Sequence, residues 1–168
     1  MVQIKHKETG EVLLEIPGTS LAGQKLAGAH LPEADFSNCD LSKTDFRNAD
    51  LRNANFRGAL GEKPFFHSAD VSGAVFDEAK FDGVDFTDSR INEASFEQCR
   101  MPGAIFRYAK VTKSSFVESD FTEADMSSAE MQVDFDHATL TRVDFRGSNL
   151  SNTNFTAANL MGADLSGA

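Results

Sequence analysis

The sequence is poor in several residue types. It contains no tryptophan, one tyrosine and two cysteines among 168 residues, whereas phenylalanine occurs fifteen times. Ordinary domains distribute their aromatic positions among all three aromatic residues, so a specific structural demand selects phenylalanine here. No apolar run approaches the roughly 18 residues of a membrane helix, and none follows the basic residues of the opening MVQIKHKETG. We therefore expect no membrane partner and predict a cytoplasmic protein.

Basic residues are also scarce. The chain has 16 Lys and Arg residues against 26 Asp and Glu residues, which gives a net charge of -10. Nucleic acids and anionic membranes both bind basic surfaces, so this balance argues against direct binding to nucleic acid. An acidic protein can nevertheless mimic nucleic acid.

The main feature of the sequence is a repeat of five residues. From Leu26 to Met131 every fifth residue is large and apolar, and after one missing residue the series resumes at Phe135 and runs to Leu165. Gly61 is the one exception among these 29 central residues. Alanine stands two residues before the central residue in 16 repeats, and Asp or Asn stands directly before it in 15. Neither an α-helix nor a flat strand has this period, and Asp and Asn side chains at such positions can satisfy nearby backbone groups.

The motifs ADFSN, ADLRN, ANFRG and ANLMG resemble the A-(D/N)-L-x-x consensus of the pentapeptide-repeat family, over residues 24–168. The resemblance implies an all-β fold, a right-handed quadrilateral parallel β-helix with one repeat per side and about twenty residues per coil. This chain would form about seven coils. It also implies a surface that binds partners, since many family members have no known activity, while the quinolone-resistance members engage type II topoisomerases.

Sorting the central residues by every fourth repeat tests the implied coil. The third column consists entirely of phenylalanine, the first column on the opposite side is mostly phenylalanine, and the other two are mostly aliphatic. Such columns would fill a narrow shaft at native packing density. The third column is Phe36, Phe56, Phe76, Phe96, Phe116, Phe135 and Phe155, and the first is Leu26, Phe46, Phe66, Phe86, Phe106, Met126, Phe145 and Leu165.

Two segments depart from the repeat. Residues 1–18 alternate apolar and polar residues around Glu8-Thr9-Gly10, which predicts a β-hairpin that caps the coils formed by residues 19–168. Residues 57–65, RGALGEKPF, place Gly61 at a central position. We expect Leu60 to turn inward and fill the gap at Gly61, and the alternative is a partner-binding knuckle.

Residues with catalytic or metal-binding chemistry are scattered. The four histidines fall on different coils, and no HxH, HExxH or CxxC spacing occurs, so we expect no metal and no cofactor. Cys39 and Cys99 fall at the small inward position, about 14 Å apart by strand spacing, which is too far for a disulfide. A filled shaft leaves no substrate pocket, and we predict that the protein is not an enzyme.

Surface charge distinguishes one side of the expected rod. The side of the third column carries seven acids against one base, Arg57, whereas the side of the fourth column, Leu41 to Leu160, is balanced. Five of the acids are not required by the motif and form a candidate partner-binding face, with a merely solubilising face as the alternative. They are Asp77, Glu78, Glu97, Glu118 and Asp136.

The last coil has no predicted cover. Phe155, Leu160 and Leu165 would face its open end, so we expect weak end-to-end self-association, giving a homodimer through the C-terminal coil.

Two functions remain in view. The first is a rigid protein-interaction module whose partner the sequence does not identify. The second is an acidic DNA mimic that binds a type II topoisomerase, as the resemblance to the quinolone-resistance members implies. Those relatives typically dimerise through a C-terminal helix or carry projecting loops, and neither feature appears in this sequence.

Overall fold

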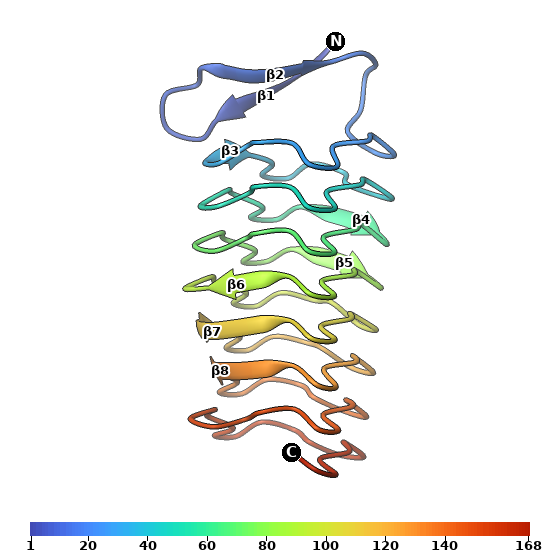
Figure 1. Cartoon of the computed structure of the whole chain (residues 1–168), viewed down its shortest axis with the longest axis vertical. Helices are drawn as coiled ribbons and strands as arrows, with labels where there is room; N and C mark the ends of the chain where they lie inside the picture. Colours follow the sequence, from blue (N-terminus) through green and yellow to red (C-terminus); the bar gives the residue numbers. More distant parts are fainter.

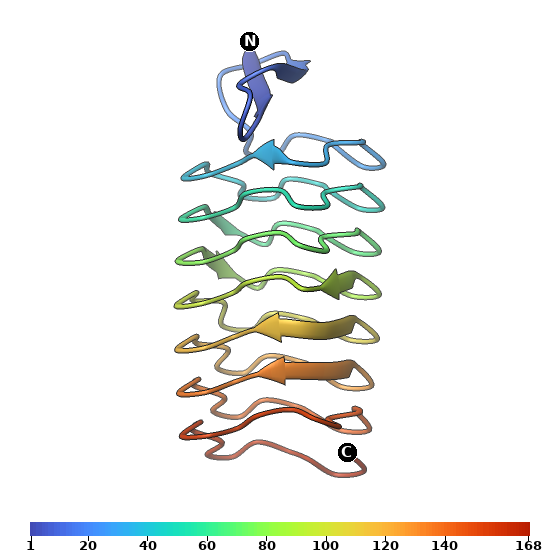
Figure 2. The ribbon, with the colours of Figure 1, turned by 90° about the vertical axis from the view of Figure 1, so that its left-hand side faces the viewer.

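The computed structural model describes all 168 residues and forms a straight rod of stacked coils with a hairpin at one end (Figures 1 and 2). It contains strands and turns but no helix, hence none that could cross a membrane. The strands are β1 (Val2–His6), β2 (Val12–Ile16), β3 (Ala34–Asp35), β4 (Leu60–Glu62), β5 (Lys80–Asp82), β6 (Arg90–Asn92), β7 (Lys110–Ser115) and β8 (Glu130–Asp134).

Each coil pairs in parallel with the next. Bridges join residues twenty positions apart, for example Asp45 to Phe65 and Phe65 to Asp85, and β4 pairs with β5 at the same spacing. Central N–H groups donate to the following coil, as Phe66 N does to Asp85 O at 2.7 Å, and the residue before them donates to the preceding coil, as Phe65 N does to Thr44 O at 2.9 Å. The expected all-β parallel β-helix with a twenty-residue coil is confirmed.

A tight turn at every corner keeps the coil closed. The second residue after each central residue except Met131 has a positive φ, such as 58° at Asn48 and 65° at Gly58. The next N–H usually donates back to the central carbonyl, as Thr44 N does to Leu41 O at 3.0 Å. This is the geometry of a type II turn, which requires a left-handed third residue.

The shaft is filled by the columns that the repeat predicts. Phe76 is fully buried and stacks on Phe56 and Phe96 of its own column, with ring centroids 4.5 and 4.6 Å apart. It meets Phe86 of the opposite column edge to face, at 5.5 Å and 88°. The interior is therefore continuous aromatic and aliphatic packing.

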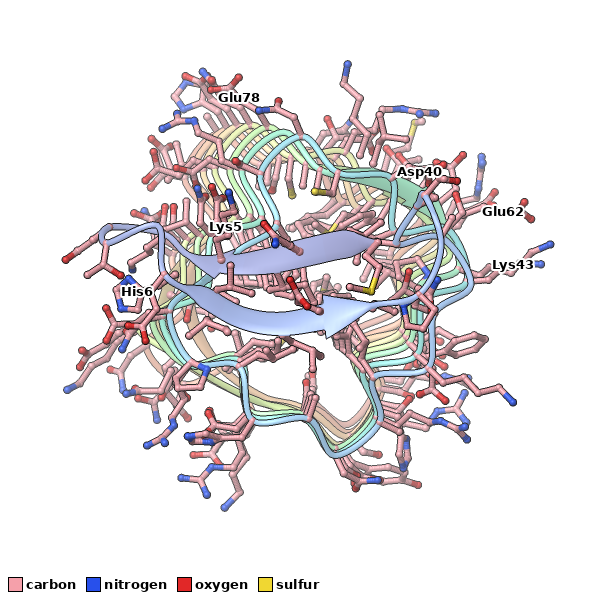
Figure 3. All side chains as sticks on the ribbon, turned by 90° about the horizontal axis from the view of Figure 1, so that it is seen from above. Lys5, His6, Asp40, Lys43, Glu62 and Glu78 are labelled. Carbon is pink, nitrogen blue, oxygen red and sulfur yellow. The ribbon has the colours of Figure 1, made fainter.

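The hairpin lies across the mouth of the shaft, as the view from above shows (Figure 3). β1 pairs antiparallel with both β2 and β3, so β1 is the central strand of a small sheet. Ile4 and Ile16 turn toward the core and are 1% and 7% exposed. The repeat begins one unit earlier than the sequence pattern suggested, because Leu21 is buried and Gly23 forms the first left-handed corner.

The break at residues 57–65 differs from the sequence-based expectation. The prediction that Leu60 turns inward is wrong, because Leu60 is 48% exposed. Its backbone is fixed in the ladder, with Leu60 N donating to Cys39 O at 3.0 Å and Leu60 O accepting from Leu41 N at 2.8 Å. Instead, the backbone at Gly61 approaches the preceding coil so closely that an added Cβ would lie 2.7 Å from Ser42 N.

The missing residue between Met131 and Phe135 removes a corner. β8 pairs with β7 until a register shift between Thr112 and Ser114, after which Ser114 pairs with Val133. The left-handed Lys113 of the previous coil thus has no counterpart, and Val133 takes the inward position. Bridges that span the missing residue join residues nineteen apart, as Asp125 to Asp144, and the spacing returns to twenty from the bridge of Asp134 to Asn154.

Candidate functional site

Many acids of the rod serve the turns. An Asp or Asn before the central residue accepts a hydrogen bond from the backbone N–H two residues later, as Asp85 does from Thr87 N at 2.9 Å and Asn154 from Thr156 N at 3.0 Å. These side chains satisfy an N–H that the ladder between coils leaves free. Acids at this position are thus explained by architecture, and a functional site must be sought among the others.

The five acids that the motif does not require lie on one side of the rod, in successive coils. Asp77, Glu97 and Asp136 directly follow the third-column phenylalanines Phe76, Phe96 and Phe135. Glu78 and Glu118 stand at the corner of the same side, with φ of 60° and 56°. Figure 3 shows Glu78 pointing outward from one corner, while Lys43 projects from another. We call this set Asp77, Glu78, Glu97, Glu118 and Asp136 the acidic face.

Arg57 is the one base on this side of the rod. It donates to Glu78 through Nε at 3.2 Å and Nη2 at 2.9 Å, and lies 3.9 Å from Asp77. Glu97 accepts a hydrogen bond from Ser115 Oγ at 2.9 Å, and Glu118 from Gln98 Nε2 at 2.8 Å. Neutral donors fix these carboxylates without cancelling their charge.

Asp136 closes the acidic face toward the C-terminus. Its Oδ1 is buried and accepts no hydrogen bond, although it lies 2.9 Å from Nδ1 of the neighbouring His137. This oxygen is the only buried side-chain polar atom of the chain without a hydrogen-bond partner.

On the opposite side of the rod, several acids are paired with arginines, whereas Asp85 and Asp88 make no ion pair. Asp45 receives two hydrogen bonds from Arg47, at 2.9 and 2.7 Å, and Asp144 is bound in the same way by Arg146. The arginine hydrogen bonds lower the pKa of both carboxyl groups below the usual value. Glu97 and Glu118, in neighbouring coils of the acidic face, have no basic partner.

No group of three His, Cys, Asp or Glu side chains converges anywhere in the structure to hold a metal ion. Cys39 and Cys99 are free thiols, and burial raises the pKa of both, well above the usual value for Cys99. A thiol with a raised pKa is a poor nucleophile near neutral pH.

The C-terminal residues singled out in the sequence lie in the last coil of the rod, where Phe155 stacks on Phe135 at 5.5 Å. Phe155 and Leu160 pack partly against the core, and Leu165 is 43% exposed.

The sequence pattern missed one surface feature. A groove of about 500 Å³ runs along the corner beside the acidic face. Its lining residues are Asn38, Gly58, Leu60, Glu78, Lys80 and Gln98. The sequence did contain a signal for this groove. Leu60 stands directly before a central residue, and the hydrogen bonds between coils make every side chain at that position point outward.

Two family models match the sequence. The model of pentapeptide repeats matches residues 18–59 and 69–107, in eight copies, and that of the pentapeptide repeat region matches residues 89–165. No curated protein matches the chain.

Solved structures of other repeat proteins are similar to the chain. A pentapeptide repeat protein of the Arabidopsis thaliana thylakoid lumen is 30% identical over 59% of this chain and 69% of its own, with a TM-score of 0.42. HetL, involved in heterocyst differentiation regulation in the cyanobacterium Nostoc, is 20% identical over 89% and 84%, with a TM-score of 0.39. QnrB1, a plasmid-mediated fluoroquinolone resistance protein, is 18% identical over 88% and 78%, with a TM-score of 0.47.

Proposed function

Because the chain belongs to the pentapeptide-repeat family, we propose that it is a non-enzymatic, rigid interaction module that binds a protein partner through the acidic face. The observation that carries this proposal is the contrast between two sides of one rod. Turn acids of one side, such as Asp45 and Asp144, are paired with arginines, whereas Glu97 and Glu118 are held by neutral groups.

Rigid spacing gives the acidic face its specificity. Coils in a parallel ladder repeat at about 4.8 Å, so the carboxylates form a row with a fixed interval. Fixed charges cost little ordering entropy on binding, and a row of one sign steers a partner of opposite sign. The partner we propose therefore presents several lysine or arginine side chains on a firm surface.

Comparative affinity capture from an extract of the source cell tests the proposal. The test variant is Glu97→Gln with Glu118→Gln and Asp136→Asn. The matched control is Glu62→Gln with Asp82→Asn and Glu123→Gln, which removes the same charge from the side of the fourth column. We expect a partner that the wild-type chain and the control retain and the test variant loses, and whose binding weakens as salt is raised.

Equal capture by all three proteins would contradict the acidic face as a binding site. It would leave the acids with a role in solubility, which is the competing interpretation.

DNA mimicry is the second candidate function. The net charge of -10 and an acidic side along a straight rod favour it, since such a rod presents the charge sign of a duplex. The expected partner in that case is a type II topoisomerase.

A further inference from the structure

Leu60 occupies a place that stability does not explain. It stands directly before a central residue, where an Asp or Asn would accept a turn hydrogen bond, yet it is an apolar side chain exposed by almost half. The ladder hydrogen bonds on both sides of its backbone prevent an inward turn. Gly61 lies close to the backbone of the preceding coil, since an added Cβ would be 2.9 Å from the carbonyl carbon of Leu41 and 2.7 Å from Ser42 N. The backbone therefore leaves no inward space for the Leu60 side chain.

A glycine lies at the corner next to Leu60. The corner residues of this side are Asn38, Gly58, Glu78 and Gln98 in successive coils, and Gly58 alone has no side chain. A Cβ at Gly58 would lie 2.6 Å from Asn38 Oδ1. The Asn38 amide thus covers Gly58, and Leu60 is the hydrophobic residue in the lining of the groove.

The two edges of the groove differ in charge. Glu78 belongs to both the groove and the acidic face, and Gln98, also in the lining, donates to Glu118 at 2.8 Å. The groove is thus continuous with the acidic face. On the other edge stands Lys80, which makes no ion pair.

We propose that this groove is the anchor site for one apolar side chain of the protein partner. The partner segment crosses the corner of the rod with basic residues on the acidic face, a leucine-like side chain against Leu60 and an acidic residue at Lys80. An apolar contact surrounded by charged pairs has the composition of an interface hot spot with a polar rim. This inference rests on the proposed function. It specifies the order in which basic, apolar and acidic residues follow one another in the partner segment.

Charge order also argues against a second copy of the chain as the occupant. The acidic face would then need a basic row on another copy, and the bases on its other sides are mostly paired with acids, as Arg47, Arg107 and Arg146 are.

Two synthetic peptides test the anchor without knowledge of the partner. The first is acetyl-Arg-Arg-Gly-Leu-Gly-Glu-amide, and the second has Ser in place of Leu. Each is titrated by NMR into the wild-type chain, Leu60→Asp and Phe65→Asp. Asp is the motif's own residue at both positions, so both variants retain the fold, and Phe65 is the matched control because it is also exposed, at 38%, but does not line the groove.

We expect the Leu peptide to bind the wild-type chain about fivefold more tightly than the Ser peptide, a fraction of the effect of burying a whole leucine. This advantage should vanish in Leu60→Asp and persist in Phe65→Asp.

Two results would overturn the anchor alone: equal binding of the peptides by the wild-type chain, or an advantage that survives in Leu60→Asp. In either case the acidic face stands if Glu97→Gln with Glu118→Gln weakens both peptides. Failure of both peptides to bind at millimolar concentration would overturn the anchor and the acidic face together. A dimer in light scattering that Leu60→Asp abolishes would replace the partner by a second copy.

Discussion

At the scale of single residues, the abundance of phenylalanine follows from the spacing of the coils. Strands in a sheet lie about 4.7 to 4.9 Å apart, which is close to the distance at which flat rings stack with an offset. The third-column rings stack at 4.5 to 5.5 Å except at Phe116 and Phe135, which are tilted by 50°, and their edges meet the first column. A tryptophan would be too wide for the shaft, which accounts for its absence.

The first prediction concerns Phe96 in the middle of the third column. Phe96→Ala should lower the free energy of unfolding by about 3 to 5 kcal/mol, because the rings above and below cannot close the cavity. Denaturant titration followed by circular dichroism measures it, and the folded spectrum should be unchanged. A loss below about 1 kcal/mol would mean that Phe96 contributes little to the packing of the shaft.

The second prediction concerns Asp50. Hydrogen bonds from Arg52 hold the pKa of this carboxyl at about 2, whereas an unfolded Asp has a pKa of about 3.9. A lowered folded pKa contributes stability that is complete above about pH 4 and is lost as the pH falls toward 2. Unfolding titrations should therefore show a smaller drop between pH 4 and pH 2 in Asp50→Asn than in the wild-type chain.

Asp88→Asn is the control for this titration, since Asp88 is a corner acid without an ion pair or hydrogen bond. At pH 7 the Asp50→Asn cost should stay near 1 kcal/mol or less, because the pair with Arg52 is largely exposed. Identical pH profiles for all three proteins would show that the pair is not maintained in solution.

At the scale of the repeat, the sequence predicted nearly every inward residue because each repeat has the same environment. The period alone identifies the central residue and the small residue two before it. Leu21 stands five residues before Leu26 and extends the same period, but neither Thr19 nor Ser20 before it matches the Ala or the Asp and Asn of the motif. Leu60 was misplaced because sequence reasoning weighed its hydrophobicity, whereas the main-chain ladder decides which way a side chain points.

The candidate site was less predictable than the fold. A period of twenty residues is enough to place these acids on one face of the rod. Their neutral or basic partners could not be predicted, because they depend on side-chain contacts between coils. Glu97 with Ser115 and Glu78 with Arg57 are such contacts. The groove depends on Gly58 and Leu60 lying on opposite sides of one corner, which the family consensus does not encode.

The third prediction concerns the hairpin, which we propose closes the shaft. Ile4→Ala should cost about 2 to 5 kcal/mol and should loosen the first coil. Hydrogen exchange measures it at the amides of Leu26 and Leu31, which bond to Asp45 O and Asp50 O. Leu13→Ala, on the outer surface of β2, is the control and should leave these amides protected. Equal exchange in both variants would contradict a capping role.

At the scale of the whole molecule, the fourth prediction concerns DNA mimicry. Tight corners connect the sides of the coils and no loop interrupts residues 21–168, so the coils lack the projecting loops that the resemblance associates with quinolone resistance. In a gyrase supercoiling assay with a fluoroquinolone, we expect neither protection nor inhibition at low micromolar concentration. Clear protection that Glu97→Gln with Glu118→Gln abolishes would instead make DNA mimicry the leading function.

The fifth prediction concerns the C-terminal end of the rod. We propose that a second copy covers the last coil, where Phe155 and Leu160 are only partly buried. The contact would be one shaft cross-section, near or below the size of a stable interface, so the dimer should be weak. Light scattering over a concentration series should show association that Leu160→Lys prevents. A chain that remains monomeric at high micromolar concentration, like the variant, would leave this end uncovered.

The alignment of the ladder has a mechanical consequence. Backbone hydrogen bonds between coils run along the rod, and each coil contacts only the coils above and below it. A tensile load applied through the two termini therefore breaks the hydrogen bonds of one coil at a time, rather than those of all coils together. Each rupture would release about twenty residues, or roughly 70 Å of contour length, so the molecule would yield in even steps from whichever end gives way first.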